Sequence, residues 1–330
     1  MKIKIGVLGA GHLGKIHLRL LKGIEAYELM GFYDASPEAA ARVAGELGVR
    51  AYESVDALLA DVDAVDIVTP TTTHFELASR AVKQFKHIFI EKPITSTVEE
   101  ARALMRLVAE AGVKAQVGHV ERFNPAFLSV KDMALAPMFI EGHRLAQWNP
   151  RGTDVSVVLD LMIHDLDIVH RLVKSGIKRI SASGVAVVSE TPDIANARIE
   201  FNNGAVANLT ASRISVKNMR RVRLFQKSAY VTLDFLDKRA EIYTIHGEEQ
   251  AAALEAAGRP ALPIDLPTGR RLITIESPEP VPVNSIQMEL EEFARAIRDN
   301  LEPAVTVDAA TTALQTAYAI LEKITPFEVQ

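Results

Sequence analysis

The stretch Lys4-Ile-Gly-Val-Leu-Gly-Ala-Gly-His-Leu-Gly14 decides the fold of the N-terminal half. Its apolar run, which starts at Ile3, is typical of a strand buried on both faces. Gly9 permits a tight turn, Gly11 lets bare backbone approach a pyrophosphate, and Gly14 lets the next helix pack close to the strand. Strand, glycine turn and helix together predict a dinucleotide-binding unit, because the helix N-terminus also attracts phosphate.

A carboxylate follows at the distance that such a unit requires. Glu28 to Tyr33 predicts a second strand, and Asp34 comes directly after it, twenty residues beyond Gly14. There it can accept hydrogen bonds from the hydroxyls of an adenosine ribose. Because Ala35-Ser36-Pro37 follows, with no arginine to receive a 2′-phosphate, we expect NAD rather than NADP. A flavin or a methyl donor is an alternative of lower weight.

Length and composition limit the remaining possibilities. A chain of 330 residues favours two domains, and a hydrophobic content of 48% suffices for two cores. The net charge of -5 offers no bulk attraction to nucleic acid or anionic lipid. The absence of cysteine excludes disulfides and thiolate metal sites. No apolar run is long enough to cross a bilayer. We therefore expect a soluble cytoplasmic protein that binds neither nucleic acid nor membrane.

The first half alternates between strands and helices. Strands are predicted at 3–8, 28–33, 49–52, 64–68, 87–90 and 114–117, and helices after the glycine turn and at 37–47, 55–60, 74–85 and 98–112. This alternation predicts an α/β domain with a doubly wound parallel sheet. Such sheets bind ligands at the carboxyl edge, which would then bring together Gly9, Asp34, Thr69, Glu91 and Gly118. We assign residues 1–122 to a dinucleotide-binding Rossmann domain.

The second half predicts an α+β domain with a large, mostly antiparallel open sheet. Its strands are expected at 139–147, 180–188, 195–201, 205–211, 221–225 and 230–235, and its helices at 285–300 and 308–323. Residues 247–269 are taken as a partly mobile excursion. We assign 123–330 to substrate binding and oligomerisation, with C-terminal helices able to pack back on the first domain. Because an open sheet must cover its second face, we expect a homo-oligomer, a dimer or tetramer.

Glu91-Lys92-Pro93 follows a predicted strand at the cofactor edge. From this position the Lys92 ammonium could polarise a substrate oxygen or share a proton with it. The alternative is a solvated lysine before a turn proline.

A second polar group lies in a largely apolar segment predicted to be helical. Asp160, His164 and Asp167 are spaced i, i+4 and i+7, and so share one face of a helix. Buried polar groups are costly unless they pair, which favours a proton relay with His164 as general base and a carboxylate orienting it. A structural His-Asp hydrogen bond at a domain interface is the alternative. A metal site has lower weight because no His-x3-His pair is present, and we expect none.

These motifs, with Thr69-Pro70 and His74 and with the run Gly118 to Pro125, span essentially the whole chain. As a set they resemble the Gfo/Idh/MocA family. The resemblance implies an NAD(P)-dependent dehydrogenase acting on a CH-OH group of a sugar, cyclitol or sugar nucleotide. It implies Lys92, Asp160 and His164 as the catalytic group. The implied cofactor site comprises Gly9, Gly11, His12, Leu13, Gly14, Asp34, Thr69, Pro70, His74, Glu91 and Lys92.

One segment departs from the family pattern. Many members have a glycine pair before the aspartate and a glycine two residues after it, whereas Ser156 to Leu159 precede Asp160 here and Met162 follows. The run Arg151 to Asp167 resembles a subgroup that includes UDP-N-acetylglucosamine 3-dehydrogenases, which serve diamino-sugar synthesis for lipid A. An inositol or free-sugar dehydrogenase of the same family is an alternative. A non-catalytic NAD-binding sensor or subunit is an alternative of another class.

A nucleotide-sugar substrate would need cations for its diphosphate and a ring to stack on its base. Exposed arginines on a sheet are often only solvated, which is the competing interpretation. Besides Asp160 and His164, the candidate substrate-binding residues are Arg122, Asn124, Arg144, Trp148, Arg151, Arg220, Arg221 and Arg223.

Overall fold

The computed structural model describes residues 2–149, 155–267 and 269–324. The chain divides into two compact units, each assembled from two stretches of sequence. Unit 1 contains residues 1–123 and 283–315, and unit 2 contains residues 124–282 and 316–330. The segment 283–315 therefore folds with the N-terminal half.

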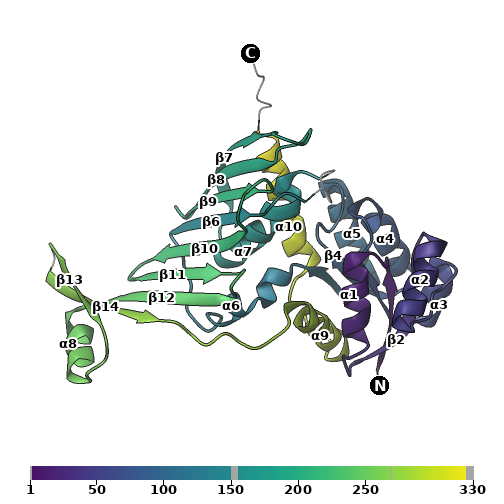
Figure 1. Cartoon of the computed structure of the whole chain (residues 1–330), viewed down its shortest axis with the longest axis horizontal. Coiled ribbons are helices and arrows are strands. Elements are labelled where there is room, and N and C mark those ends of the chain that lie inside the picture. The colour runs from purple at the N-terminus through teal and green to yellow at the C-terminus, as the bar shows by residue number, and fades with distance from the viewer. Residues whose placement is uncertain (1, 150–154, 268, 325–330) are drawn as a thin grey trace, which may run out of the picture. The chain divides into compact units, whose positions relative to one another are not determined.

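Unit 1 is built on a five-stranded parallel sheet with the order β2-β1-β3-β4-β5 (Figure 1). Its strands are β1 (Ile3–Leu8), β2 (Tyr27–Tyr33), β3 (Ala64–Ile67), β4 (His87–Glu91) and β5 (Ala115–Gly118). The predicted Rossmann sheet is confirmed, with all five strands ending at one edge. The strand predicted at 49–52 is wrong, because only Ala51 bridges to Phe32 there.

The helices of unit 1 begin and end at residues suited to those places. They are α1 (His12–Leu21), α2 (Pro37–Leu47), α3 (Val55–Asp61), α4 (His74–Lys83), α5 (Val98–Ala111) and α9 (Ser285–Arg298), with 3-10 turns η1 (Thr71–Thr73) and η2 (Val120–Phe123). Thr97 and Glu100 form a capping box at the start of α5. Gly48 ends α2 with φ 59°. Helices α1 and α9 contact each other, and Leu18 and Phe293 share a core with β1.

Unit 2 is built on a nine-stranded sheet with the order β13-β14-β12-β11-β10-β6-β9-β8-β7. All neighbours are antiparallel except β6 and β9, so the predicted open sheet is confirmed. Its strands are β6 (Phe139–Leu145), β7 (Ile177–Val185), β8 (Ile194–Phe201), β9 (Val206–Ser212), β10 (Met219–Gln226), β11 (Ala229–Asp234), β12 (Arg239–His246), β13 (Leu262–Leu266) and β14 (Gly269–Glu276).

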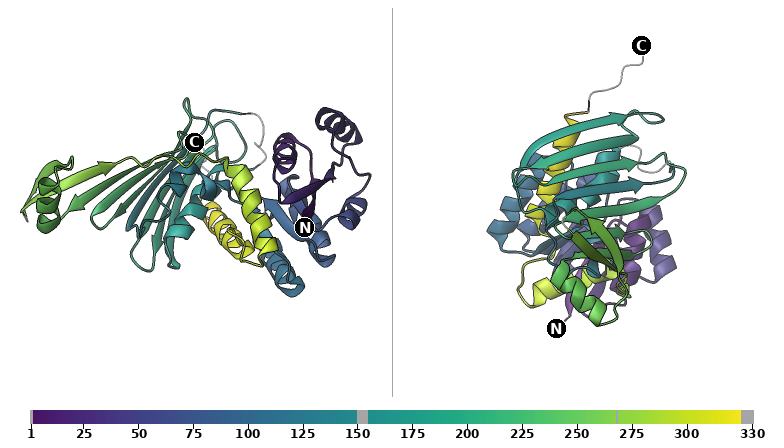
Figure 2. Two further views of the ribbon diagram at one scale, coloured as in Figure 1. Left: turned by 90° about the horizontal axis from the view of Figure 1, so that it is seen from below. Right: turned by 90° about the vertical axis from the view of Figure 1, so that its left-hand side faces the viewer.

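Helices cover one face of this sheet. The short helix α6 (Pro125–Leu128) precedes β6, and the π-helical turn η3 (Val158–Met162) runs into α7 (Ile163–Leu172). Helix α10 (Val307–Leu321) starts in unit 1 and ends in unit 2, where its last turns pack on the sheet (Figure 2). No helix within the described parts of the chain is both long and apolar enough to cross a membrane.

The segment expected to be a partly mobile excursion, residues 247–269, contains regular secondary structure in its described residues. They contain α8 (Glu248–Ala256) and β13, which with β14 extend the sheet beyond β12 (Figure 1). Alanine and glutamate favour helix at the positions of α8. Residue 268 lies outside the described residues.

Candidate active site

The glycine turn between β1 and α1 has the geometry that its sequence predicts. Gly9 has φ +96°, and a Cβ there would lie 2.8 Å from the Val68 carbonyl oxygen. A Cβ on Gly14 would clash with the Gly9 carbonyl, so α1 approaches the turn closely. Gly11 caps α1, and a Cβ there would have nothing within 4 Å. Bare backbone thus faces open space at a helix N-terminus, which fits a dinucleotide pyrophosphate. His12 and Leu13 follow in the first turn of α1.

Asp34 is fixed beside this turn by two backbone groups. Its Oδ2 accepts from Ala10 N at 2.8 Å, and its Oδ1 accepts from Ser36 N at 2.9 Å. Each carboxylate oxygen keeps further acceptor capacity. The side chain is half-buried at the carboxyl end of β2, so it is both oriented and accessible, as a ribose acceptor must be.

His74 joins the loops that follow β3 and β4. Its Nε2 lies 2.8 Å from the Thr69 carbonyl oxygen and its Nδ1 lies 2.9 Å from that of Pro93. Thr69 is half-buried and Pro70 exposed, whereas His74 itself is buried. Burial lowers the pKa of His74, and the carbonyl groups of Thr69 and Pro93 oppose that effect. His74 therefore holds the two strand-end loops together.

Lys92 is held at the end of β4 by its neighbours. The Glu91 carboxylate accepts from the Lys92 N–H at 3.1 Å, and the Lys92-Pro93 peptide bond is cis. Lys92 is half-buried, whereas Glu91 is buried. The triplet thus holds the backbone of Lys92 tightly at the carboxyl edge of the sheet.

In unit 2, Asp160 and His164 lie on consecutive turns of different kinds. Asp160 belongs to the π-helical turn η3, and His164 to the first turn of α7. The sequence predicts one continuous α-helix here, so this local prediction is wrong. The core of unit 2 fully buries Val157, Val158 and Met162 of this segment. Asp160 and His164 are half-buried, whereas Asp167 is buried. Wide π turns are frequent at functional sites.

Several predicted substrate-binding residues have structural partners. Arg144, on β6, pairs with Asp165 of α7, with Nη2 to Oδ1 at 2.8 Å and 3% of each side chain exposed. Asn124 caps α6 and donates to the Phe235 carbonyl oxygen at 3.0 Å. In unit 1, Arg122 donates to the Ala304 carbonyl oxygen at 3.1 Å. These contacts give the three side chains roles in the fold.

The remaining candidates lie at the surface or outside the described residues. Trp148 is 43% exposed. Arg221 pairs with Asp234, and Arg223 pairs with Glu141, each at 2.8 Å. Arg220 is exposed on the same strand, and Arg151 lies outside the described residues.

Sequence reasoning missed a buried polar cluster behind the cofactor edge. It consists of His17 on α1, Asp66 on β3, Glu91 on β4 and Glu289 on α9, of which only Glu91 was predicted as a site residue. His17 follows Gly14 by three residues, one turn along α1, so its position beneath the glycine turn was a readable signal. Glu289 gives no such signal, because only the folded chain brings α9 to β4.

Comparison with known proteins agrees with this architecture in both units. Residues 3–119 match the model of the oxidoreductase family with an NAD-binding Rossmann fold, and residues 104–249 match the GFO/IDH/MocA C-terminal domain. The chain belongs to the Gfo/Idh/MocA oxidoreductase family.

Two relatives within this family are especially informative. A UDP-N-acetylglucosamine 3-dehydrogenase from Acidithiobacillus ferrooxidans is 44% identical over 73% of this chain and 77% of the relative. Its solved structure superposes with a TM-score of 0.87 at 35% identity, covering 98% of both chains. A scyllo-inositol 2-dehydrogenase (NAD(+)) from Bacillus subtilis is 34% identical over 65% of this chain and 68% of the relative. Like these Gfo/Idh/MocA proteins, the chain is a dehydrogenase acting on CH-OH groups, with an NAD(P)-binding Rossmann domain.

Proposed function

We propose that the protein is an NAD-dependent UDP-N-acetylglucosamine 3-dehydrogenase. The observation that carries this proposal is the similarity to the A. ferrooxidans enzyme, which extends through both units. An inositol 2-dehydrogenase from Rhizobium meliloti reaches 32% identity over 77% of this chain, so inositol is the second substrate to test. In either case we assign dinucleotide binding to residues 1–122 and substrate binding to residues 123–330. The segment 283–315 is the exception, because it folds with unit 1.

The preference for NAD over NADP rests on Asp34. Its carboxylate, oriented by Ala10 N and Ser36 N, accepts from ribose hydroxyls and repels a 2′-phosphate. The turn from Gly9 to Gly14 holds the pyrophosphate, with His12 and Leu13 in the adjoining helix turn. Thr69, Pro70, Glu91 and Lys92 border the cofactor at the ends of β3 and β4. His74 contributes through the loops that it joins.

The catalytic group is Lys92, Asp160 and His164. The bound nicotinamide accepts a hydride when the alcohol is oxidised. His164 takes the hydroxyl proton as general base, and Asp160 orients its imidazole. The Lys92 ammonium stabilises the negative charge that develops on the substrate oxygen. Trp148 stacks on the base of the nucleotide, and Arg122 binds its diphosphate. Asn124 and Arg144 support the site by holding α6 and α7.

The protein forms a homo-oligomer through the open face of the nine-stranded sheet. Phe225 stacks on Tyr230 with ring centroids 4.8 Å apart, and Tyr230 on Tyr243 at 5.3 Å. Phe225 is 39% exposed, so this aromatic row is available to a second copy of the chain. Light scattering of the purified protein gives the number of copies, and a monomer at all concentrations would contradict this part of the proposal.

The first test is NADH formation by purified protein with NAD or NADP and a panel of UDP-N-acetylhexosamines, free hexoses and inositols. We expect turnover with NAD and UDP-N-acetylglucosamine. Turnover only with inositols or free sugars would replace the substrate assignment, and a preference for NADP would remove the role given to Asp34. Absence of turnover across the panel, with NAD bound, would contradict the proposal.

The second test removes the catalytic groups. Lys92→Ala and His164→Ala should each lower kcat about a hundredfold or more while NAD binding is retained, which is the usual size of acid-base effects. Lys83→Ala and His246→Ala are matched controls, since Lys83 is exposed and His246 lies on β12. Full activity in either catalytic variant would exclude that residue from the mechanism.

A further inference from the structure

The Glu91 carboxylate connects the backbone at Lys92 to a buried imidazole. Its Oε2 accepts from the Lys92 N–H at 3.1 Å, and its Oε1 lies 3.5 Å from His17 Nε2. Gly118 faces Glu91 across the β4–β5 pair, and a Cβ there would lie 2.7 Å from Oε1. A glycine in the neighbouring strand thus makes room for this carboxylate, so its position is specified from two sides.

His17 is placed between two carboxylates. Its Nδ1 lies 2.8 Å from Asp66 Oδ2, and neither side chain is exposed to solvent. Burial alone would lower the pKa of His17, but Asp66 and then Glu91 raise it to about 8. With Asp66 hydrogen-bonded at Nδ1 and Glu91 3.5 Å from Nε2, the two negative charges favour the imidazolium form.

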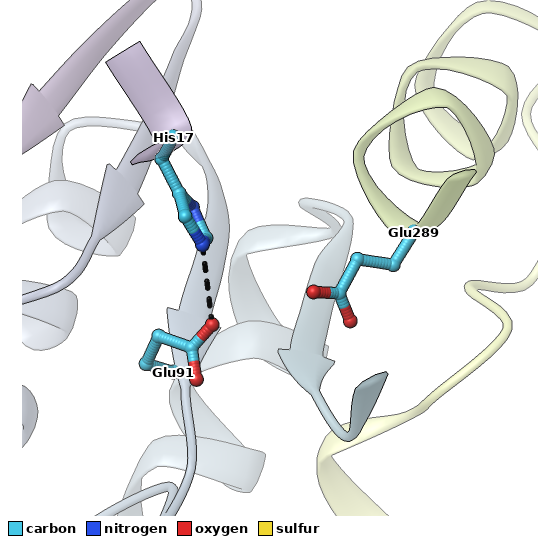
Figure 3. A group of neighbouring side chains, drawn as sticks. All are labelled: His17, Glu91 and Glu289. Carbon is cyan, nitrogen blue, oxygen red and sulfur yellow. Dashed lines mark ion pairs between the residues drawn. The ribbon is translucent and has the colours of Figure 1, made fainter. Parts of the chain in front are cut away.

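Glu289 adds a third carboxylate to this cluster from α9. It is fully buried, and neither carboxylate oxygen has a hydrogen-bond partner among the described residues. One of its oxygens lies within 4.8 Å of ligand atoms of both His17 and Glu91, and its carboxyl group points toward them (Figure 3). The helix is held in this place by backbone contacts, because Gln116 donates to the Glu289 carbonyl at 2.6 Å and Tyr27 to the Leu290 carbonyl at 2.7 Å.

The charges around Glu289 favour its neutral form. Burial, together with the negative charges of Glu91 and Asp66, raises the pKa of Glu289 well above its ordinary value. The cations of the cluster are His17 and, beyond Glu91, Lys92. A neutral carboxyl group adds no charge, so it can lie within 4.8 Å of the Glu91 carboxylate without repelling it. An ionised Glu289 would instead repel Glu91 and disturb the group that holds Lys92.

We propose that Glu289 is a positioning residue, which through Glu91 and His17 fixes the backbone and hence the ammonium of Lys92. This inference rests on the proposed function, because Lys92 is the catalytic group that it positions. Glu289 would not touch substrate or cofactor. It would act from behind the strand, keeping Glu91 in the place where it accepts the Lys92 N–H.

The test is a double-mutant cycle between Glu289 and Lys92. Glu289→Ala should lower kcat about tenfold or more, with KM for NAD nearly unchanged, since small misplacements of catalytic groups have large effects. Glu289→Gln keeps the side-chain volume and a hydrogen-bond donor, so it should retain most of the kcat that Glu289→Ala loses. It should also abolish the change in kcat that Glu289 ionisation causes at alkaline pH. In a Lys92→Ala background, Glu289→Ala should have almost no further effect. Glu291→Ala, on the exposed side of α9, is the matched control.

Three outcomes of the kinetic and metal measurements would overturn the inference. These are additive losses in the cycle, Glu289→Gln as inactive as Glu289→Ala, or a stoichiometric divalent metal in the purified wild-type protein that Glu289→Gln removes. Normal turnover of Lys92→Ala alone would contradict the proposed function instead. An independent readout without substrate is the rate at which acetic anhydride labels Lys92, followed by mass spectrometry. Glu289→Ala should change this rate, and Glu291→Ala should not; an unchanged rate would also overturn the inference.

Discussion

The two units bury charged side chains in different ways. In unit 2, Arg144 donates from two nitrogens to Asp165, and Arg213 lies 3.4 Å from Asp193, so each of these two buried carboxylates has its own cation. In unit 1, His17 is shared by Asp66 and Glu91, with Glu289 close by. In a balanced pair each charge compensates the other, whereas an excess of buried carboxylates is costly to the fold and is typical of functional sites. The unbalanced cluster lies directly behind the proposed catalytic lysine.

The largest effect on stability is expected at the balanced pair of unit 2. Asp165→Ala leaves the Arg144 guanidinium buried without its carboxylate, which should lower the free energy of unfolding by about 3–5 kcal/mol. Urea denaturation measures this change. Arg179→Ala is the control, because Arg179 and Glu200 form a pair in which 64% of the arginine side chain is exposed. It should leave the free energy of unfolding nearly unchanged, because solvent screens this pair. Equal losses in both variants would show that burial does not decide the contribution.

The Arg144–Asp165 pair also shows what the sequence could not reveal. Asp165 lies next to His164, but its partner is on β6, and no local spacing joins the two. By contrast, Gly9 to Gly14 and Asp34 belong to one strand-helix-strand unit, where local pattern determines geometry. The five strand ends were predicted for the same reason. Val158 and Met162 of η3 are buried in the core of unit 2, and Glu289 meets His17 only through tertiary contacts. These features depend on the folded core rather than on local pattern.

A smaller effect is expected at low pH in unit 2. Burial alone would raise the pKa of Asp193, but the backbone N–H groups of Ser189, Val188 and Val187 lower it to about 2. A depressed pKa in the folded state means that this stabilisation is present above the ordinary value of 3.8 and is lost as the pH falls through about 2. Asp193→Asn should therefore flatten the acid limb of the melting temperature against pH. If the acid limb is unchanged in this variant, carboxylates other than Asp193 cause the acid denaturation.

The smallest effect is expected at alkaline pH in unit 1, and its sign is opposite. The pKa of His17 is raised to about 8 in the fold, so its stabilisation is complete below the ordinary 6.5 and is lost as the pH rises through about 8. Stability should decline across this window, and His17→Gln should remove the decline. If that variant is too unstable to melt cooperatively, NMR titration of the histidine rings in the wild-type protein measures the same pKa. A value for His17 below 6.5 would mean that the imidazole is neutral at physiological pH. Asp66 and Glu91 would then lose their shared cation, and the contrast between the two units would rest on hydrogen bonds rather than on charge.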